Sequence, residues 1–138
     1  MNLENNSFSH EIPPQIGHLR RLQVLSLYNN SIDGKTPHNI SACSNLRRIN
    51  LQWNKLVGEI PNLEMMKLKV INLRANNLTG TVPPSLGNVS SLEELYLSEN
   101  NLHGVLPESF GHLMNLKLLY LLENRFSGTV PPSIFNLT

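Results

Sequence analysis

The sequence predicts an α/β-type solenoid in which short parallel strands from successive repeats stack into one sheet. Three residue types recur in the same register along the chain. Asparagine returns after 24, 24, 22, 24 and 24 residues, and glycine and proline keep the same step. A fixed period in this range is typical of stacked-repeat architectures. The recurring asparagines are Asn6, Asn30, Asn54, Asn76, Asn100 and Asn124.

The strand of each repeat is indicated by an alternating L-x-L core, such as Leu95 and Leu97 ahead of Asn100. Alternation with a period of two marks a strand with one buried face. A single repeat cannot bury its own leucines, so we expect neighbouring strands to stack in parallel about 4.8 Å apart.

The recurring asparagines are expected to be structural. A side-chain amide has both a donor and an acceptor, and it can satisfy backbone groups that point inward where the chain leaves the strand. The glycine that follows permits a positive φ. His10 replaces that glycine in the first copy, and we expect local strain there.

The outer side of each repeat is expected to be a short turn. Segments such as 84–89 follow an [IV]-P step and are too short and polar for a long helix, which favours a 3₁₀ or irregular turn. The third repeat is two residues shorter than its neighbours between Pro61 and Ile71. We expect a tighter turn there, with Met65 or Met66 filling the gap.

The chain is expected to be a single repeat segment without caps. Stacked repeats need polar terminal units to cover the last core layer, and neither end shows one, which favours a piece of a longer solenoid. The expected divisions are a partial repeat 1–21, repeats 22–45, 46–67, 68–91 and 92–115, and a truncated last repeat 116–138.

Composition and motifs give no indication of chemistry. The net charge of +1 gives no reason to expect nucleic acid, and the single cysteine, Cys43, cannot form an internal disulfide. No apolar run approaches the roughly 20 residues that span a bilayer, so direct membrane insertion by this segment is not expected. No phosphate loop, nucleophile elbow or metal-binding spacing occurs. We therefore expect no catalytic residue, no metal and no cofactor.

Six N-x-[ST] sequons occur, more than chance pairing of 19 asparagines with 18 serines and threonines would produce. The excess predicts a secreted, glycosylated surface, although repeat composition inflates the count. Asn39, Asn88 and Asn136 are the better candidates because they fall on the outer turn. The others are Asn5, Asn29 and Asn77.

The outward strand positions hold the variable residues, and they include all three tyrosines and the only tryptophan. Tyr, Trp and Arg anchor interfaces, although aromatic residues also suit strands in general. Tyr96 and Tyr120 occupy one slot in adjacent repeats, so their rings should be neighbours. We expect a basic, Trp-bearing middle and an acidic, Tyr-bearing C-terminal part. The predicted contact residues are Tyr28, Arg48, Gln52, Trp53, Arg74, Glu94, Tyr96, Ser98, Tyr120 and Leu122.

The repeat consensus, L-x-x-L-x-L-x-x-N-x-L-x-G-x-[IV]-P, resembles the plant-type leucine-rich repeat, especially that of receptor-like kinase ectodomains. Segments 76–92 and 95–107 carry the resemblance most clearly. It implies a right-handed horseshoe with a concave parallel sheet and 3₁₀ or irregular convex turns.

The resemblance also implies a function. The chain would be a non-catalytic segment of a plant receptor-like kinase or receptor-like protein in signalling or defence. It would bind a peptide or protein ligand, with a co-receptor as a further partner, at the extracellular face of the plasma membrane. The alternative is a secreted protein of the polygalacturonase-inhibitor type. An enzyme is a third hypothesis, and it would require an acid–base or metal constellation that we do not find.

Overall fold

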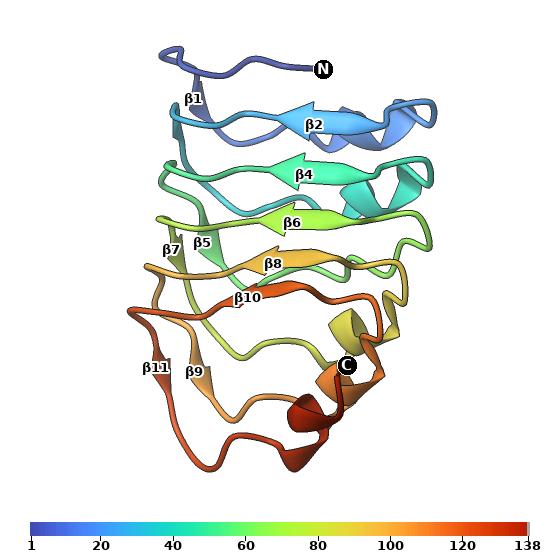
Figure 1. Ribbon diagram of the computed structural model, residues 1–138. Helices are drawn as coiled ribbons and strands as arrows, with labels where there is room; N and C mark the ends of the chain where they lie inside the picture. The colour runs from blue at the N-terminus through green and yellow to red at the C-terminus, as the bar shows by residue number, and fades with distance from the viewer. Residues whose placement is uncertain (138) are drawn as a thin grey trace.

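The computed structural model describes residues 1–137 as a solenoid with one main strand in each of five successive repeats (Figure 1). These strands form one parallel sheet in the order β10-β8-β6-β4-β2. Equivalent slots face each other, so that Leu95 pairs with both Ile71 and Leu119. The predicted solenoid is confirmed. The strands are β2 Val24–Ser26, β4 Arg48–Asn50, β6 Val70–Asn72, β8 Glu94–Tyr96 and β10 Leu118–Tyr120.

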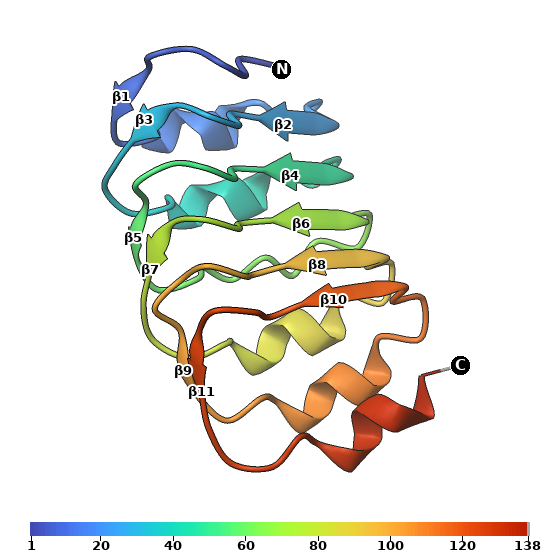
Figure 2. The ribbon, with the colours of Figure 1, turned by 60° about the vertical axis from the view of Figure 1, so that its left-hand side comes forward.

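Shorter strands form along one side of the stack, where the chain turns away from the main sheet (Figure 2). They pair in parallel as β1-β3, β5-β7 and β9-β11. These ladders form just before the [IV]-P step of each repeat, because proline has no N–H to donate. These strands are β1 Ser9–His10, β3 Ser31–Ile32, β5 Val57–Gly58, β7 Asn77–Leu78, β9 His103–Gly104 and β11 Arg125–Phe126.

The outer side consists of five-residue 3₁₀ turns, each entered through a proline. Proline suits this position because its fixed φ matches the turn and its missing N–H would be unpaired there. The segment predicted to form such a turn near Pro84 does so. The turns are η1 Pro14–His18, η2 His38–Ala42, η3 Pro84–Asn88, η4 Glu108–His112 and η5 Pro132–Asn136.

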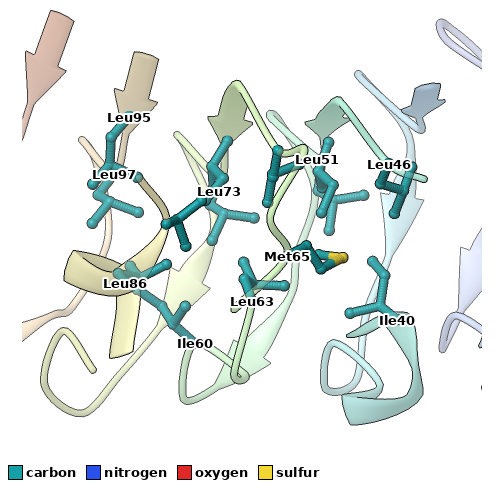
Figure 3. Close-up of a cluster of buried hydrophobic side chains, with 14 of the residues drawn as sticks. Ile40, Leu46, Leu51, Ile60, Leu63, Met65, Leu73, Leu86, Leu95 and Leu97 are labelled. Carbon is teal, nitrogen blue, oxygen red and sulfur yellow. The ribbon is translucent and has the colours of Figure 1, made fainter. Parts of the chain in front are cut away.

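The shortened third repeat has no 3₁₀ turn between β5 and β6 (Figure 1). Its two missing residues leave too little chain to complete one. Leu63 and Met65 instead point into the core and are 1% and 3% exposed (Figure 3), whereas Met66 is 85% exposed. Met65 is therefore the side chain that fills the gap.

The recurring asparagines connect neighbouring repeats. The Asn100 amide donates to the carbonyls of Leu73, Leu97 and Ser98 at 3.0, 3.0 and 3.1 Å. Its Oδ1 accepts from the Leu78 N–H at 3.0 Å. One side chain therefore joins two repeats through four hydrogen bonds. The same pattern holds at Asn30, Asn54, Asn76 and Asn124, whereas among the described residues the Asn6 side chain bonds only within its own turn, to the carbonyls of Leu3 and Glu4.

Two slots in each repeat take the left-handed backbone. His10 has φ 67°, beside 79° for the equivalent Gly104, so the departure from glycine does place a side chain in a strained region. The slot before each recurring asparagine is also left-handed, with Trp53 at φ 55°. Sequence reasoning missed this slot because no residue type marks it. Its other members are Asn5, Asn29, Ala75, Glu99 and Glu123.

We expect Thr36→Val to raise the free energy of unfolding by about 1 kcal/mol, because a buried hydroxyl without a partner is costly. Thr36 is 7% exposed, its Oγ1 has no hydrogen-bond partner, and equivalent slots hold Ile12, Ile60 and Val82. Urea denaturation measures the change, with the exposed Thr79→Val as the control. An unchanged or lower midpoint for Thr36→Val would show that the hydroxyl is satisfied.

Candidate functional site: the concave sheet face

The side chains on the concave face form rows across the strands, because equivalent slots are in register. Asn50, Asn72, Tyr96 and Tyr120 face one another from β4 to β10. We call these four residues the tyrosine row. Two positions further along each repeat lie Gln52, Arg74, Ser98 and Leu122, which we call the serine row. The two rows bring six of the ten predicted contact residues side by side: Gln52, Arg74, Tyr96, Ser98, Tyr120 and Leu122.

The tyrosine row ends in a stacked pair. The rings of Tyr96 and Tyr120 lie 5.1 Å apart between centroids and 8° from parallel, which confirms the neighbouring rings predicted from their shared slot. The Tyr96 hydroxyl donates to Glu94 Oε2 at 3.0 Å. Burial, and then the carboxylate of Glu94, raise the pKa of Tyr96 above its ordinary value. The hydrogen bond to Glu94 holds the phenol in one orientation.

A hollow of about 330 Å³ opens beside this pair, and we call it the β8 hollow. It exists because Ser98 is the smallest side chain of the serine row and lies between Arg74 and Leu122. Leu122 is 67% exposed, whereas Ser98 is 3% exposed. The structure therefore places Ser98 at the floor of the hollow and not among the freely exposed contact residues.

The acidic wall of the hollow comes from the slot before the recurring asparagines. Glu99 and Glu123 both line the hollow. Arg74 donates to Glu99 Oε1 from Nε at 2.8 Å and from Nη2 at 2.6 Å. The sequence predicted a basic middle that is separate from an acidic C-terminal part. The ion pair shows instead that Arg74, in the middle, is bound to a carboxylate of the acidic part. Arg48 makes no ion pair among the described residues.

The N-terminal half of the face carries a second aromatic pair. The rings of Tyr28 and Trp53 lie 6.1 Å apart and are tilted by 37°, and Trp53 is 48% exposed. Gln52 lies beside them, and its Oε1 accepts from Asn72 Nδ2 at 2.7 Å. The concave face therefore offers two aromatic clusters, one on each side of β6.

An ion-pair row lies at the edge of the sheet, just before the strands. Glu93 binds Lys69 Nζ at 2.5 Å and Lys117 Nζ at 2.8 Å. The hydrogen bonds from Lys117 and Lys69 lower the pKa of Glu93 to about 2. Glu93 and Glu94 do not act as a carboxylate pair, because Glu93 binds the two lysines and Glu94 accepts from the Tyr96 hydroxyl.

We expect the Glu93 carboxylate to remain ionised as the pH falls below 4, with its midpoint near 2. Because the folded-state pKa lies below the unfolded value, its contribution to stability is present above the unfolded pKa and is lost as the pH falls through the folded one. The carboxyl carbon shift in an NMR titration measures this, and Lys69→Gln with Lys117→Gln should move the midpoint upward. A midpoint near 4.5 in the parent chain would refute the ion-pair row.

Other hollows also occur in residues 1–137. A hollow of about 830 Å³ lies beside the shortened third repeat and includes Lys35, His38 and Glu59, but no Phe, Tyr or Trp is among the described residues that line it. Within the described residues there is no group of three or more potential metal ligands. None of their helices has the length and apolar character that crossing a membrane requires.

Comparison with known families agrees with the repeat geometry. A family model described as "Leucine rich repeat" matches residues 1–56 and 66–126. The chain belongs to the leucine-rich repeat family. The gap in the match covers the shortened outer turn of the third repeat, where the leucine-rich repeat pattern is lost.

Several plant receptors resemble this leucine-rich repeat chain. Receptor-like protein 32 of Arabidopsis thaliana is 36% identical over an alignment of 98 positions, which covers 66% of this chain and 11% of that protein. The plant peptide hormone receptor RGFR1, solved with RGF2, has a TM-score of 0.98 at 34% identity, over 99% of this chain and 22% of that one. The Arabidopsis receptor kinase HAESA, solved with the peptide hormone IDA and the co-receptor SERK1, has a TM-score of 0.78 at 31% identity, over 99% of this chain and 27% of that one. The chain thus spans only a small part of each relative.

Proposed function

We propose that this chain is a ligand-recognition segment of a plant receptor kinase or receptor-like protein, and that its concave sheet binds a peptide or protein. The observation that carries the proposal is the gathering of all three tyrosines and the only tryptophan on that sheet as two ring pairs, beside a defined hollow. Aromatic side chains in such positions are typical anchors of interfaces.

The relatives support a receptor over the secreted inhibitor. The solved neighbours include hormone receptors with a bound peptide, and one of them also holds a co-receptor. Under this proposal, the extracellular face of the plasma membrane is where the segment works, and a co-receptor is a second partner. The segment itself would be non-catalytic, as ectodomains of this fold generally are, and any kinase domain would lie outside this sequence.

Glycans would fit this arrangement if they attach on the outer turns. Asn88 and Asn136 are exposed and Asn39 is half-buried, all on the side away from the sheet. The Asn88 amide donates to Glu64, and the Asn29 amide donates to Asn5 Oδ1 at 2.9 Å. Asn77 is exposed within β7. The sequon of Asn136 ends at Thr138, which lies outside the described residues.

The proposal is tested by recovering the ligand from extracellular fluid of plant tissue. The parent ectodomain is immobilised as the wild type, as Tyr96→Ala/Tyr120→Ala and as the outer-face control Ser85→Ala, and bound peptides are compared by mass spectrometry. We expect at least one peptide that wild type and Ser85→Ala enrich and the tyrosine variant does not. Equal recovery by all three forms would contradict recognition through the concave face.

A further inference from the structure

Ser98 is an unusual residue for the bottom of a hollow. Its side chain is 3% exposed, it lines the β8 hollow, and its Oγ has no hydrogen-bond partner among the described residues. Leaving a buried hydroxyl unpaired is unfavourable. The other buried serine of the sheet, Ser26, donates to Glu4, so the fold does satisfy such a group elsewhere. The Oγ atom itself is covered, so a group that enters the hollow reaches the unpaired Ser98 hydroxyl only when the side chains above it move.

The charges around the hollow favour a cation. Both hydrogen bonds from Arg74 end on Oε1 of Glu99, which leaves Glu99 Oε2 without a protein partner, and the Glu123 carboxylate makes no ion pair in residues 1–137. Glu94 adds a third carboxylate, behind the Tyr96 hydroxyl. Among the residues that line the hollow, Arg74 is the one cation, and it is already paired. The two lining carboxylates, Glu99 and Glu123, therefore outnumber it.

We propose that the β8 hollow binds the guanidinium group of an arginine side chain in the ligand; this inference rests on the proposed concave recognition. The parallel rings of Tyr96 and Tyr120 present aromatic surface to a planar cation, which a guanidinium matches better than an ammonium. Its N–H groups would donate to Glu123, to the free oxygen of Glu99 and to Ser98 Oγ. The exposed side chain of Leu122 provides apolar surface for the methylene stem.

Capped single residues test the hollow without knowledge of the natural ligand. The probes are N-acetyl-arginine amide, its uncharged isostere N-acetyl-citrulline amide, and N-acetyl-lysine amide. The protein is labelled with ¹³C-tyrosine and titrated in NMR experiments. Its three ring signals are assigned with Tyr→Phe variants.

We expect the arginine probe to shift the signals of Tyr96 and Tyr120 but not Tyr28. We expect its affinity to exceed that of the citrulline probe by about tenfold, because charge-assisted hydrogen bonds and cation–π contacts are lost with the charge. Glu123→Gln and Ser98→Ala should each weaken arginine binding several-fold. The control is Glu59→Gln, which changes an exposed glutamate in the hollow beside the shortened third repeat and should leave arginine binding unchanged. The lysine probe should bind more weakly than the arginine probe.

Equal binding of arginine and citrulline, or a Tyr28 shift as large as those of Tyr96 and Tyr120, would overturn the guanidinium subsite. An unchanged affinity in both Glu123→Gln and Ser98→Ala would do the same. If these tests fail but the Tyr96→Ala/Tyr120→Ala variant still loses binding of the natural ligand, recognition through the concave face stands and only the guanidinium subsite is refuted. If the hollow selects arginine but the tyrosine variant binds the natural ligand as tightly as the wild type does, the proposed function is refuted instead.

Discussion

Asn100→Ala should lower the free energy of unfolding by about 3 kcal/mol or more, whereas Asn101→Ala should change it by less than about 0.5 kcal/mol. The Asn100 side chain is 8% exposed and makes four hydrogen bonds across two repeats. Its removal leaves the Leu78 N–H unpaired in the interior, and it takes one of two amide donors from the Leu73 carbonyl, which also accepts from Asn76 Nδ2. The neighbouring Asn101 side chain makes no hydrogen bond in the described structure.

Urea denaturation of the two variants beside the parent chain measures this difference. The two substitutions delete the same atoms from adjacent positions, so their effects on the unfolded chain are matched. Equal shifts of the two midpoints would contradict the assignment of Asn100 to the interior and, with it, the register of every repeat.

Tyr96→Ala, Tyr120→Ala and Trp53→Ala should each weaken binding of the recovered ligand by at least about 2 kcal/mol, or roughly thirtyfold. Each substitution removes one ring of a pair on the concave face. Isothermal titration calorimetry with the intact ectodomain gives the affinities. Ser85→Ala on the outer turn is the control and should bind as the parent does.

Loss of affinity confined to the two tyrosine variants would limit the contact to the C-terminal cluster and would refute the part assigned to Trp53. An affinity unchanged in all three variants would contradict the whole assignment of the binding face. Circular dichroism of each variant separates loss of contact from loss of folding.

The periodic elements of the fold could be predicted from the sequence because each is enforced by a repeated physical demand. Leucines at alternate positions had to form a buried strand face, and Asn100 had to satisfy inward backbone groups. The two-residue deficit predicted a tighter third turn, and Met65 fills it. The shared slot of Tyr96 and Tyr120 was enough to predict their stacked rings, because register is fixed by the repeat.

The site was harder to predict because it depends on differences between repeats. The β8 hollow arises where Ser98 interrupts a row of longer side chains, and a pattern search for large anchors treats Ser98 as an ordinary contact. Glu99 and Glu123 occupy a left-handed slot that no residue type marks. The ion pair between Arg74 and Glu99 joins residues 25 positions apart. The sequence analysis assigned them to the basic middle and the acidic C-terminal part of the face, so it did not predict that they bind each other.

The most direct test of the central claim, that the concave sheet is the ligand-binding face, is site-specific photocross-linking. Benzoylphenylalanine is introduced at Gln52 or Leu122 on the sheet and at Ser85 on the outer turn of the parent ectodomain. After irradiation with the recovered ligand, cross-linked peptides are identified by mass spectrometry. The account predicts ligand adducts from Gln52 or Leu122 and none from Ser85. Adducts from Ser85 alone would show that the ligand binds the opposite face.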